Sequence, residues 1–417
     1  MNPRLGLLQP YPFERLRALL GTVKPPANLR PISLGLGEPQ HPTPAVVKEA
    51  LAANLGALSK YPVTIGLPEL RTAISEWLAR RHGIPAPDAA KQVIPVNGSR
   101  EALFSIAQAT LDPDERDALV AIPNPFYQIY EGSTLLAGAK PHFINAAPGN
   151  LRPEFEKVPD ATWPRVRMMY VCSPSNPHGR VMTLDDWKRV FALSDQHGFV
   201  VVSDECYSEI YFDEARPPLG ALAAAKKLGR DAYPRLVVLG SLSKRSSAPG
   251  LRSGYAAGDA AVLEKYLQYR TYFGSAMSNA VQMASIAAWK DESHVIESRR
   301  LYREKFAAFY ERVNLVLPLT MPDAGFYFWA DVGGIACPGG TEQLAGDAAF
   351  ARDLFAATHI TVLSGSYIAR DAHGANPGKG FVRMALVSTV EDAVEAADRM
   401  HAFLAHRPAV AHAGGAA

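Results

Sequence analysis

The stretch "LVVLGSLSKRSSAPGLRSG", residues 236–254, changes character after its first five residues. The opening LVVLG is too short and too rich in β-branched residues for a helix, so it predicts a buried strand. The serines, the Pro-Gly turn and the two arginines around Lys244 fit neither a buried strand nor an amphipathic helix. The sequence therefore predicts a soft polar loop directly after a buried strand, and the other strand ends indicate what such a loop binds.

Other short apolar runs are similar to LVVLG and alternate with helical patterns. The predicted strands are VIPV (93–96), ALVAI (118–122), MMYV (168–171) and FVVVS (199–203), and the predicted helices include 100–111 and 184–198. Gly198 is a typical helix stop. Because strands that alternate with helices form a mostly parallel central sheet with helices on both faces, the expected fold class is α/β.

The pattern changes after about residue 290. The expected elements are a charged amphipathic helix (291–317), a strand in GFYFWADV (325–332), a helix around 346–358, a strand (380–386) and a last helix with Ser388 and Glu391 at capping-box spacing. These elements predict a smaller α+β domain at 291–408, which the N-terminal segment 1–45 joins, beside a large domain at 46–290. Residues 409–417 lack apolar periodicity and are expected to be disordered.

Composition argues against several classes of protein. The 417 residues include 43 Lys and Arg against 41 Asp and Glu, so the net charge of +2 gives no reason to expect a nucleic-acid or membrane partner. No apolar stretch approaches the length of a membrane span, and the N-terminus is a poor signal peptide. Because Cys172, Cys206 and Cys337 are widely scattered, we expect neither a disulfide framework nor a metal site, and we expect a reducing cytoplasm.

Polar and aromatic residues follow each predicted strand. Ligands of open parallel sheets bind at the carboxyl ends of the strands, so these residues are expected to meet at one edge. The segments are NGSR with Gly98, Ser99 and Arg100, PNPFY with Tyr127, PSNPHG with Asn176, DECY with Asp204 and Tyr207, and the 241–254 loop with Ser241, Ser243, Lys244 and Arg252. The first segment opens a helix, whose free N–H groups suit a phosphate.

Each of these residues has an ordinary structural interpretation when it is taken alone. Asp204 and Ser99 are typical caps, Asn176 begins a turn, and Lys244 is a typical solvated loop lysine. Their convergence at one edge favours pyridoxal 5′-phosphate instead. This cofactor needs a lysine for its aldehyde, a carboxylate for its pyridine nitrogen, an aromatic ring for its face, and serines, N–H groups and an arginine for its phosphate.

The order of these motifs resembles the class I/II aminotransferases of PLP fold type I, the aspartate aminotransferase-like fold, over nearly the whole chain. The resemblance implies that Lys244 binds the cofactor covalently and carries the proton in catalysis, in a cationic, partly desolvated site that is expected to lower its pKa. It implies that Asp204 faces the pyridine nitrogen. The other implied cofactor contacts are Tyr207 and Asn176 to the ring oxygen, Tyr127 on the ring face, and Gly98, Ser99, Arg100, Ser241, Ser243 and Arg252 at the phosphate.

The same resemblance implies a substrate site and a partner. Arg383 in FVRMAL matches the arginine that clamps the substrate α-carboxylate by two parallel hydrogen bonds. Gly37 of LGLGEP and Asn176 would line the substrate cavity. Tyr61 would reach the phosphate in the neighbouring subunit's site, which implies a homodimer, and no metal is implied.

The wording of three motifs narrows the resemblance. Three motifs resemble those of the proteobacterial N-succinyldiaminopimelate aminotransferases. They are SLSKRSSAPGLRSG with Arg245 after the lysine, SGSYIARDAHGANPGKGFVRMALV (364–387) and LGLGEPQHPTP. This resemblance implies amino transfer from N-succinyl-LL-2,6-diaminopimelate to 2-oxoglutarate. His178 stands where the family commonly has threonine and is either a packing variant or a group near the cofactor. Candidates for binding the succinylated end are Arg15, Lys24, Lys60 and Arg270.

Several alternatives stay open at this point. An aminotransferase for aspartate, alanine or aromatic amino acids would carry the same motifs. A C–S lyase or decarboxylase would share the cofactor groups, although Arg383 disfavours it. A non-catalytic domain of a transcription regulator would need an appended winged-helix segment, and only about thirty residues precede ISLGLGEP. A dinucleotide-binding dehydrogenase is disfavoured because GLGEP lacks the final glycine of the fingerprint.

Overall fold

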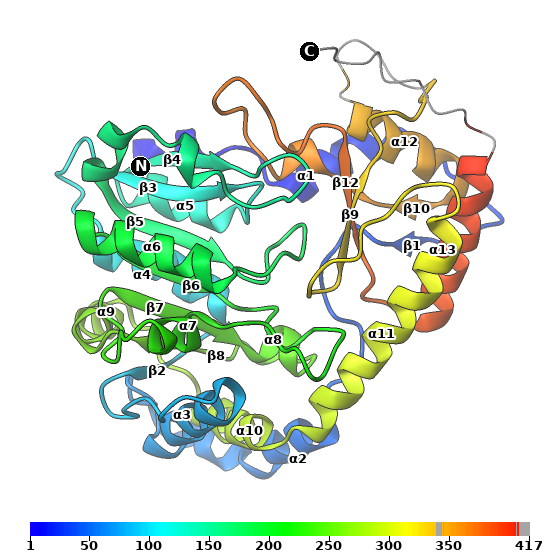
Figure 1. Ribbon diagram of the computed structural model, residues 1–417. Helices are drawn as coiled ribbons and strands as arrows, with labels where there is room; N and C mark the ends of the chain where they lie inside the picture. Colours follow the sequence, from blue (N-terminus) through cyan, green and yellow to red (C-terminus); the bar gives the residue numbers. More distant parts are fainter. Residues whose placement is uncertain (339–343, 345, 406, 408–417) are drawn as a thin grey trace.

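The structure, a computed structural model, describes residues 1–417 except 339–343, 345, 406 and 408–417. Figure 1 shows a seven-stranded sheet with its helices in one half of the molecule and a three-stranded sheet in the other. The long helix α11 (Ser293–Val313) runs from the first half into the second. The tail at 409–417, expected to be disordered, lies outside the described residues, and the domain boundaries stay predictions.

The seven-stranded sheet contains all five strands expected from the apolar runs. Its order is β2-β8-β7-β6-β5-β3-β4. The strands are β2 (Val93–Val96), β3 (Leu119–Asn124), β4 (Lys140–Asn145), β5 (Val166–Cys172), β6 (Val200–Asp204), β7 (Leu236–Ser241) and β8 (Gly254–Gly258). Neighbours from β7 to β4 are parallel, whereas β8 is antiparallel to β2 and β7. The mostly parallel α/β sheet is confirmed.

Two strands of this sheet were not predicted, for different reasons. Strand β8 has the sequence GYAAG, and small residues give no strand pattern. Its glycine is required by close approach, because a Cβ on Gly254 would lie 2.4 Å from the carbonyl oxygen of Gly240 on β7. Strand β4 (KPHFIN) lies at the edge of the sheet and is mostly half-buried, so it lacks an apolar run.

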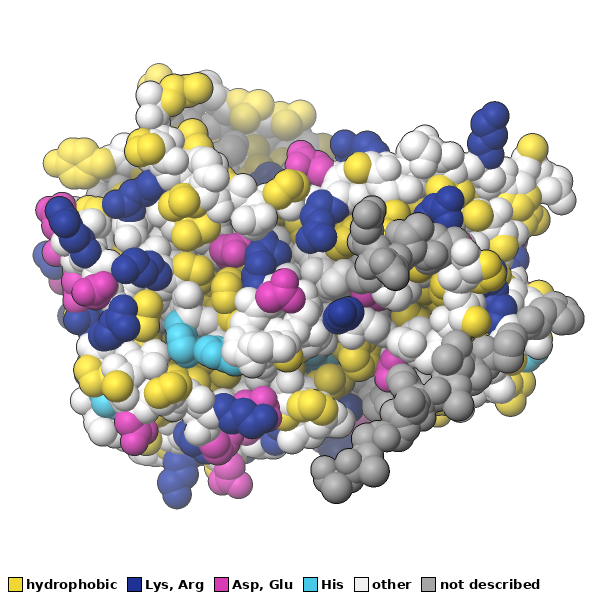
Figure 2. All heavy atoms as spheres, turned by 90° about the horizontal axis from the view of Figure 1, so that it is seen from above, with side chains coloured by type: hydrophobic (Ala, Val, Ile, Leu, Met, Phe, Trp, Pro, Cys, Tyr) yellow, Lys and Arg dark blue, Asp and Glu magenta, His cyan; other side chains and the backbone are white. Residues whose placement is uncertain are grey.

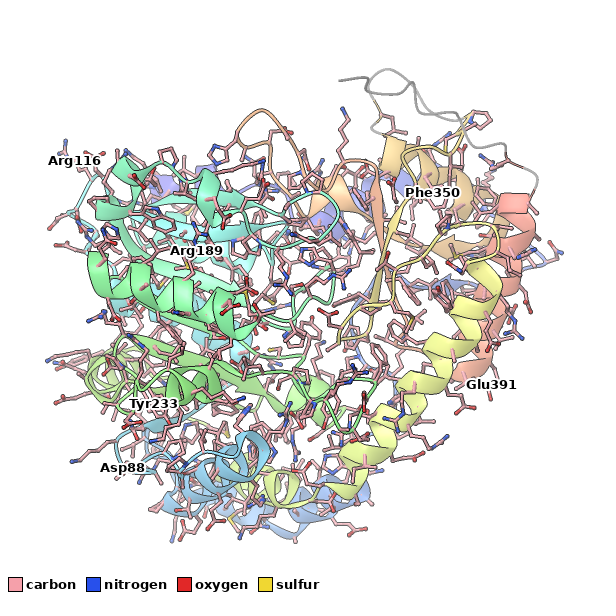
Figure 3. All side chains as sticks on the ribbon, in the orientation of Figure 1. Asp88, Arg116, Arg189, Tyr233, Phe350 and Glu391 are labelled. Atoms are coloured by element: carbon pink, nitrogen blue, oxygen red, sulfur yellow. The ribbon has the colours of Figure 1, made fainter. Side chains whose placement is uncertain are left out.

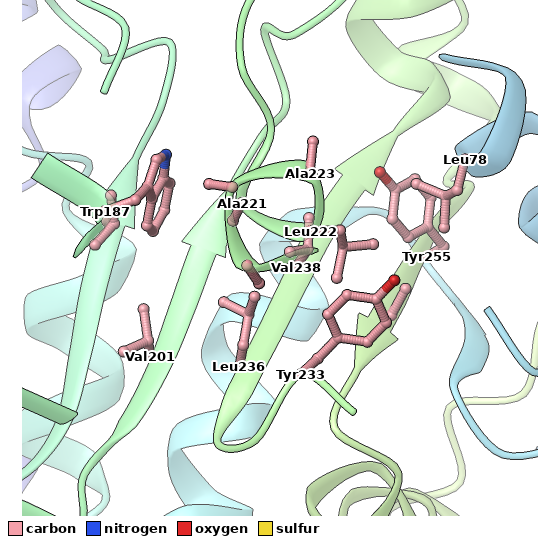
Figure 4. Packing of buried hydrophobic residues seen from close by; sticks show 14 of the residues in the cluster. Leu78, Trp187, Val201, Ala221, Leu222, Ala223, Tyr233, Leu236, Val238 and Tyr255 are labelled. Carbon is pink, nitrogen blue, oxygen red and sulfur yellow. The ribbon is translucent and has the colours of Figure 1, made fainter. Parts of the chain in front are cut away.

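Helices cover both faces of the large sheet, which explains the uninterrupted apolar strands. Figure 4 shows Val201, Leu236 and Val238 near α7 and the indole of Trp187. The next residue along β6, Val202, belongs to the apolar cluster on the opposite face. One face carries α3 (Pro68–His82), α6 (Leu184–His197), α7 (Ala221–Lys227) and α10 (Asn279–Lys290), and the other α4 (Ser99–Thr110), α5 (Ile129–Leu136) and α9 (Ala260–Phe273).

The smaller half joins the two ends of the chain. Its antiparallel sheet has the order β11-β12-β9, with β9 (Tyr327–Asp331), β11 (Leu363–Ser364) and β12 (Phe381–Ala385). Strand β1 (Ile32–Ser33) pairs in parallel with β10 (Ile360–Thr361), so the N-terminal segment is hydrogen-bonded to this half. The helices are α1 (Pro12–Leu20), α11, α12 (Gly346–Thr358) and α13 (Val390–Ala405), while α2 (Ala45–Ala53) packs on α10.

Two predictions about helix ends in this half were wrong. Helix α11 is shorter than the expected 291–317. The last helix is capped one residue later than expected, because the hydroxyl of Thr389, not Ser388, accepts a hydrogen bond from the N–H of Asp392 at 3.1 Å. Ser388 is buried instead. Serine and threonine are both good caps, so the sequence could not choose between neighbours. Figure 3 shows Glu391 at the start of this helix.

The surface agrees with the nearly balanced charge. Figure 2 shows basic and acidic side chains interspersed over the face seen from above, with no region of a single sign. In the part of the chain that the structure describes, no helix is both long enough and apolar enough to cross a lipid bilayer.

Candidate active site

A cavity of about 500 Å³ opens between the large sheet and the smaller sheet. Its walls come from the ends of β6 and β7, the first turn of α4, the segment 126–128, and strands β9 and β12. The predicted residues that line it are Gly37, Ser99, Arg100, Tyr127, Asn176, Asp204, Tyr207, Ser243, Lys244, Arg252 and Arg383. The structure therefore brings together residues from nearly the whole chain, and their individual roles stay predictions.

The lysine-bearing stretch is more ordered than the sequence suggested. Ser241 is the last residue of β7, and Leu242–Arg245 form the single helical turn α8. The Ser241 hydroxyl caps this turn by accepting a hydrogen bond from the N–H of Ser243 at 3.1 Å. The expected loop therefore begins one helical turn later than predicted: a serine cap and the buried Leu242 hold Lys244 on this turn, and the loop follows it.

Lys244 lines the cavity, and its amine is held by a hydrogen bond. Its Nζ donates a hydrogen bond to the carbonyl oxygen of Gly37 at 2.5 Å. Burial lowers the pKa of Lys244 to about 8, and the nearby charge of Arg383 adds to this shift, while Cys206 opposes it. The direction agrees with the expectation from the sequence, and burial is the main cause. At this pKa about a tenth of the amine is uncharged at pH 7, and most of it is uncharged at pH 9.

Asp204 lies at the end of β6 and is 3% exposed. Its carboxylate accepts hydrogen bonds from the hydroxyl of Tyr130 at 2.7 Å and from the N–H of Cys206 at 3.2 Å. Burial raises the pKa of Asp204, whereas these hydrogen bonds and the charge of Lys244 act in the opposite direction. Sequence reasoning missed Tyr130, although its spacing of three from Tyr127 in FYQIY was a usable signal.

Tyr327 on β9 is a second cavity residue that the sequence did not reveal. Its hydroxyl lies 3.0 Å from the hydroxyl of Tyr207, and both side chains are buried. A Cβ on Gly37 would lie only 2.0 Å from the Tyr327 hydroxyl oxygen, so only glycine fits there. The alternating pattern of GFYFWADV predicted a strand but gave no reason to single out one tyrosine.

Arg383 on β12 is the main cation of the smaller half that faces the cavity. It is 4% exposed and donates to the side-chain oxygen of Asn176 at 2.9 Å and to the carbonyl oxygen of Gly35 at 2.8 Å. Its guanidinium also lies 4.3 Å from the centre of the Tyr327 ring. The Nε of Arg383 has no hydrogen-bond partner among the described residues. A buried arginine held by neutral acceptors is suited to an incoming carboxylate.

A second positive region lies at the start of α4. Gly98 caps this helix with φ of +81°, and a Cβ there would lie 2.5 Å from an Nη of Arg252. Arg252 donates to two backbone carbonyls, those of Pro249 and Asn97. The Ser241 hydroxyl donates to that of Ser243 at 2.9 Å, and Ser243 lines the cavity together with Arg252. Free N–H groups at a helix start, hydroxyls and an arginine form a site for a phosphate.

These groups fit pyridoxal 5′-phosphate. The buried carboxylate of Asp204 suits a protonated ring nitrogen, the amine of Lys244 suits the aldehyde, and the region around Arg252 suits the phosphate. The hydroxyl of Tyr207 and the amide of Asn176 are available for the ring oxygen, and Tyr127 supplies an aromatic ring. The chemistry of the residues present therefore fits the cofactor, and the role of each residue stays a prediction.

Other singled-out residues lie outside this cavity. Tyr61 is fully exposed on this chain. Arg270, a candidate for substrate binding, is instead buried and paired with Glu101 at 2.6 Å, so that candidate was wrong. The remaining candidates, Arg15, Lys24 and Lys60, are exposed and do not line the cavity.

The two unusual residues next to the motifs have packing roles. His178 is buried beside a small cavity of about 40 Å³, where its Nδ1 lies 2.6 Å from the Ser175 hydroxyl. Burial lowers its pKa to about 3, so it is neutral at pH 7. Arg245 is 2% exposed and donates to the carbonyl of Ala288 and the carboxylate of Glu292. It therefore ties α8 to the end of α10.

Known proteins match this chain over most of its length. The family described as aminotransferase class I and II matches residues 30–400. An LL-diaminopimelate aminotransferase from Desulforudis audaxviator is 31% identical over 407 residues, which cover 96% of this chain and 97% of the relative. A crystal structure of an aminotransferase from Neisseria meningitidis has a TM-score of 0.91 at 49% identity and covers 97% of this chain and 100% of that one.

A further solved structure is similar in fold. It is described as a probable N-succinyldiaminopimelate aminotransferase from Thermus thermophilus, with a TM-score of 0.81 at 24% identity. The match covers 94% of this chain and 99% of that one. At this identity the likeness concerns the fold alone.

Proposed function

Since the chain belongs to the class I and II aminotransferases, which use pyridoxal 5′-phosphate, we propose that it transfers an amino group from N-succinyl-LL-2,6-diaminopimelate to 2-oxoglutarate. The observation that carries an amino-acid substrate is the buried Arg383 with its unpartnered Nε. Amino acids and 2-oxo acids share an α-carboxylate, and a planar guanidinium binds this group by two parallel hydrogen bonds. One arginine can thus serve both half-reactions in turn.

The residues around the cofactor site divide the chemistry between them. When bound, the cofactor supplies a conjugated ring that draws electrons from the substrate α-carbon. The Lys244 amine, with a pKa of about 8, can accept the proton of that carbon and give it back in the reverse half-reaction. In this proposal Asp204 holds a proton at the ring nitrogen, which is supported by its burial and by its hydrogen bond from Tyr130. Arg383 orients the α-carboxylate meanwhile.

A second carboxylate on the substrate needs a second cation. The side chain of Arg100 is exposed at the cavity, where its Nε donates to the Tyr127 hydroxyl at 2.6 Å. Its remaining side-chain N–H groups can donate to a distal carboxylate, while its backbone N–H is one of the free N–H groups in the first turn of α4. We therefore assign the guanidinium of Arg100 to the distal end of the donor and of 2-oxoglutarate.

Unmodified LL-2,6-diaminopimelate is the second candidate donor. It is favoured by the name of the relative from Desulforudis audaxviator. The two donors differ in charge at the distal end, because succinylation replaces an ammonium group by an amide and adds a carboxylate. A site that prefers the succinylated donor needs cations there, as Arg100 provides, whereas a site for the free donor needs a carboxylate such as Glu38, which also lines the cavity.

A donor panel with 2-oxoglutarate as acceptor tests the proposal. It contains both forms of diaminopimelate together with aspartate, alanine and phenylalanine, and glutamate formation is measured. The succinylated donor is expected to have the highest kcat/KM, and Arg100→Gln should lower it more than it lowers the value for alanine. If aspartate or alanine exceeds both diaminopimelate donors, the proposed substrate is wrong. Ammonia released without an acceptor would identify a lyase.

We also propose a homodimer in a reducing cytoplasm. Tyr61 is fully exposed, and its neighbours Leu55, Leu58 and Val63 are exposed apolar residues. Such a group of exposed apolar side chains is typical of a surface that contacts a second copy of the chain. The three cysteines are free thiols, which fits a reducing compartment. Sedimentation tests the dimer, and Tyr61→Phe should weaken cofactor binding if the tyrosine reaches a neighbouring site.

A further inference from the structure

Residues 363–373 form a segment of the smaller half that continues beyond strand β11 and contacts the carboxyl end of strand β3 in the large sheet. In Figure 1 it belongs to the orange stretch between β12 and β4. It contains SGSYIARDAH, the first part of the distinctive motif that leads to Arg383. The proposed function uses only the arginine at the end of this motif, so the rest of the motif needs its own explanation.

The backbone of this segment is fixed to the large sheet near the cavity. The amide of Asn124, at the end of β3, both accepts from the N–H of Arg370 at 3.0 Å and donates to its carbonyl at 2.8 Å. The N–H of Phe126 donates to the carbonyl of Ile368 at 3.0 Å. These contacts place the segment directly beside the cavity, because Phe126 and Ile368 both line it.

The side chain of Arg370 strengthens this attachment by a buried ion pair. Its Nε donates to one carboxylate oxygen of Glu131 at 2.9 Å, and its Nη2 donates to the other at 2.5 Å. The two side chains are 16% and 10% exposed. Glu131 belongs to α5 of the large half, so the pair joins the two halves of the molecule. Removing one member leaves the other as an unpaired buried charge, which is strongly unfavourable.

The opposite end of the segment is paired with the strand of Arg383. In the β11–β12 ladder, Leu363 lies opposite Arg383. Arg383 in turn is hydrogen-bonded to Asn176 of the large half at 2.9 Å. Arg383 is therefore connected to the large half in two ways: directly through Asn176, and indirectly through β11 and the segment that continues from it.

We propose that Arg370 and Glu131 are positioning residues that fix Arg383 at the correct distance for the substrate carboxylate. Neither residue lines the cavity, so their effect passes through the segment and β12. The ion pair fixes the position of one half relative to the other. Arg383 then binds the substrate carboxylate without having to move first. This inference rests on the carboxylate role proposed for Arg383.

The test compares Glu131→Gln, Arg370→Met and the double variant in the holoenzyme. Each single variant is expected to raise the KM for 2-oxoglutarate about tenfold, with kcat within threefold and the cofactor absorbance unchanged. The double variant should have a smaller effect than the sum of the two, because it leaves no unpaired charge. Hydrogen exchange should become faster in peptides that cover 365–373. Asp195→Asn, which removes the carboxylate partner of Arg230 and Arg235 elsewhere, is the control and should change none of these.

Several results would overturn the inference. One is faster exchange in 365–373 with an unchanged KM, since the pair would then hold the segment without positioning Arg383. Another is a fall in kcat at constant KM. If a single variant does not fold, Glu131→Asp and Arg370→Lys replace it and should give a smaller rise in KM. If Arg383→Lys also leaves KM unchanged, the proposed carboxylate role has failed and this inference fails with it. If only Arg383→Lys raises KM, the carboxylate role of Arg383 is supported, and only the positioning role of Arg370 and Glu131 is wrong.

Discussion

The two walls of the cavity are held in different ways. The lysine wall comprises residues 241–254 and Asp204 at the end of the neighbouring strand β6. The turn that carries Lys244 is capped locally, by the hydroxyl of Ser241 three residues earlier. The arginine wall is strand β12 with Arg383. The side chain of Arg383 is held by Asn176 and Gly35, which are 207 and 348 positions away in the chain. The backbone turn of the lysine wall is therefore specified by a short stretch of sequence, although the amine of Lys244 also reaches the distant carbonyl of Gly37. The position of the Arg383 side chain depends throughout on the packing of the two halves.

This difference predicts which kinetic constant each wall controls. The lysine wall holds the groups that we propose to face the cofactor, so damage there should lower kcat. The arginine wall holds the group proposed for the substrate carboxylate, so damage there should raise KM. A variant that crosses this division would break the comparison.

Replacement of Lys244 should have the largest effect. Lys244→Ala removes the only amine that lines the cavity within the described residues, and we expect kcat to fall by about 10⁴-fold. The visible absorbance of the bound cofactor that borohydride bleaches should be lost as well. Lys226→Ala, a surface lysine paired with Asp231, is the control. A colourless wild-type protein after reconstitution with excess cofactor would contradict the role of the lysine wall.

The matching prediction for the arginine wall is Arg383→Lys. An ammonium group cannot make two parallel hydrogen bonds, and loss of one charge-assisted bond costs about 2 kcal/mol, which is about 30-fold. We expect the KM for 2-oxoglutarate to rise by this factor, with a smaller change in kcat. Steady-state kinetics at saturating donor measures both. An unchanged KM with a lower kcat would mean that the two walls do not divide the work in this way.

The sequence predicted the lysine wall better than the arginine wall, for a physical reason. Buried parallel strands give apolar runs, and the residues after them fall at one edge by geometry alone, so Asp204 and Lys244 could be brought together in advance. Tyr327 could not, because its contact with Tyr207 joins positions 120 apart and the pattern of its strand is that of an ordinary core. Arg370 reads as a solvated loop residue until its buried partner is known.

Arginines also show where local patterns mislead. Arg270 on α9 was expected at the surface or at the substrate, but it is fully buried and bonded to both carboxylate oxygens of Glu101. The same sequence pattern fits a solvated arginine and a buried ion pair. Only the position of the opposing helix, α4, decides between them.

The pH dependence of cofactor binding sharpens the account of the lysine wall. In the apoprotein the neutral amine of Lys244 must attack the cofactor aldehyde, and its pKa is lowered to about 8 mainly by burial. The neutral fraction rises with pH, so the rate of reconstitution should increase about tenfold from pH 7 to pH 9 and then level off. Stopped-flow absorbance measures this rate. A rate that keeps rising beyond pH 10 would indicate an ordinary lysine pKa and a solvated amine.

The smallest effect is expected for Tyr130→Phe, which removes one hydrogen bond behind Asp204. Asp204 keeps its hydrogen bond from the N–H of Cys206, so the loss should be close to the typical net value of one hydrogen bond, about 1 kcal/mol. We therefore expect kcat to fall about fivefold while the KM for 2-oxoglutarate stays constant. Tyr170→Phe is the matched control. The ring of Tyr170 stacks on that of Tyr130, with 4.6 Å between the ring centres, but its hydroxyl donates to the carbonyl of Leu103 and not to Asp204. Equal effects in both variants would mean that Tyr130 contributes only by packing. A raised KM would mean that Asp204 affects substrate binding, against the division between the two walls.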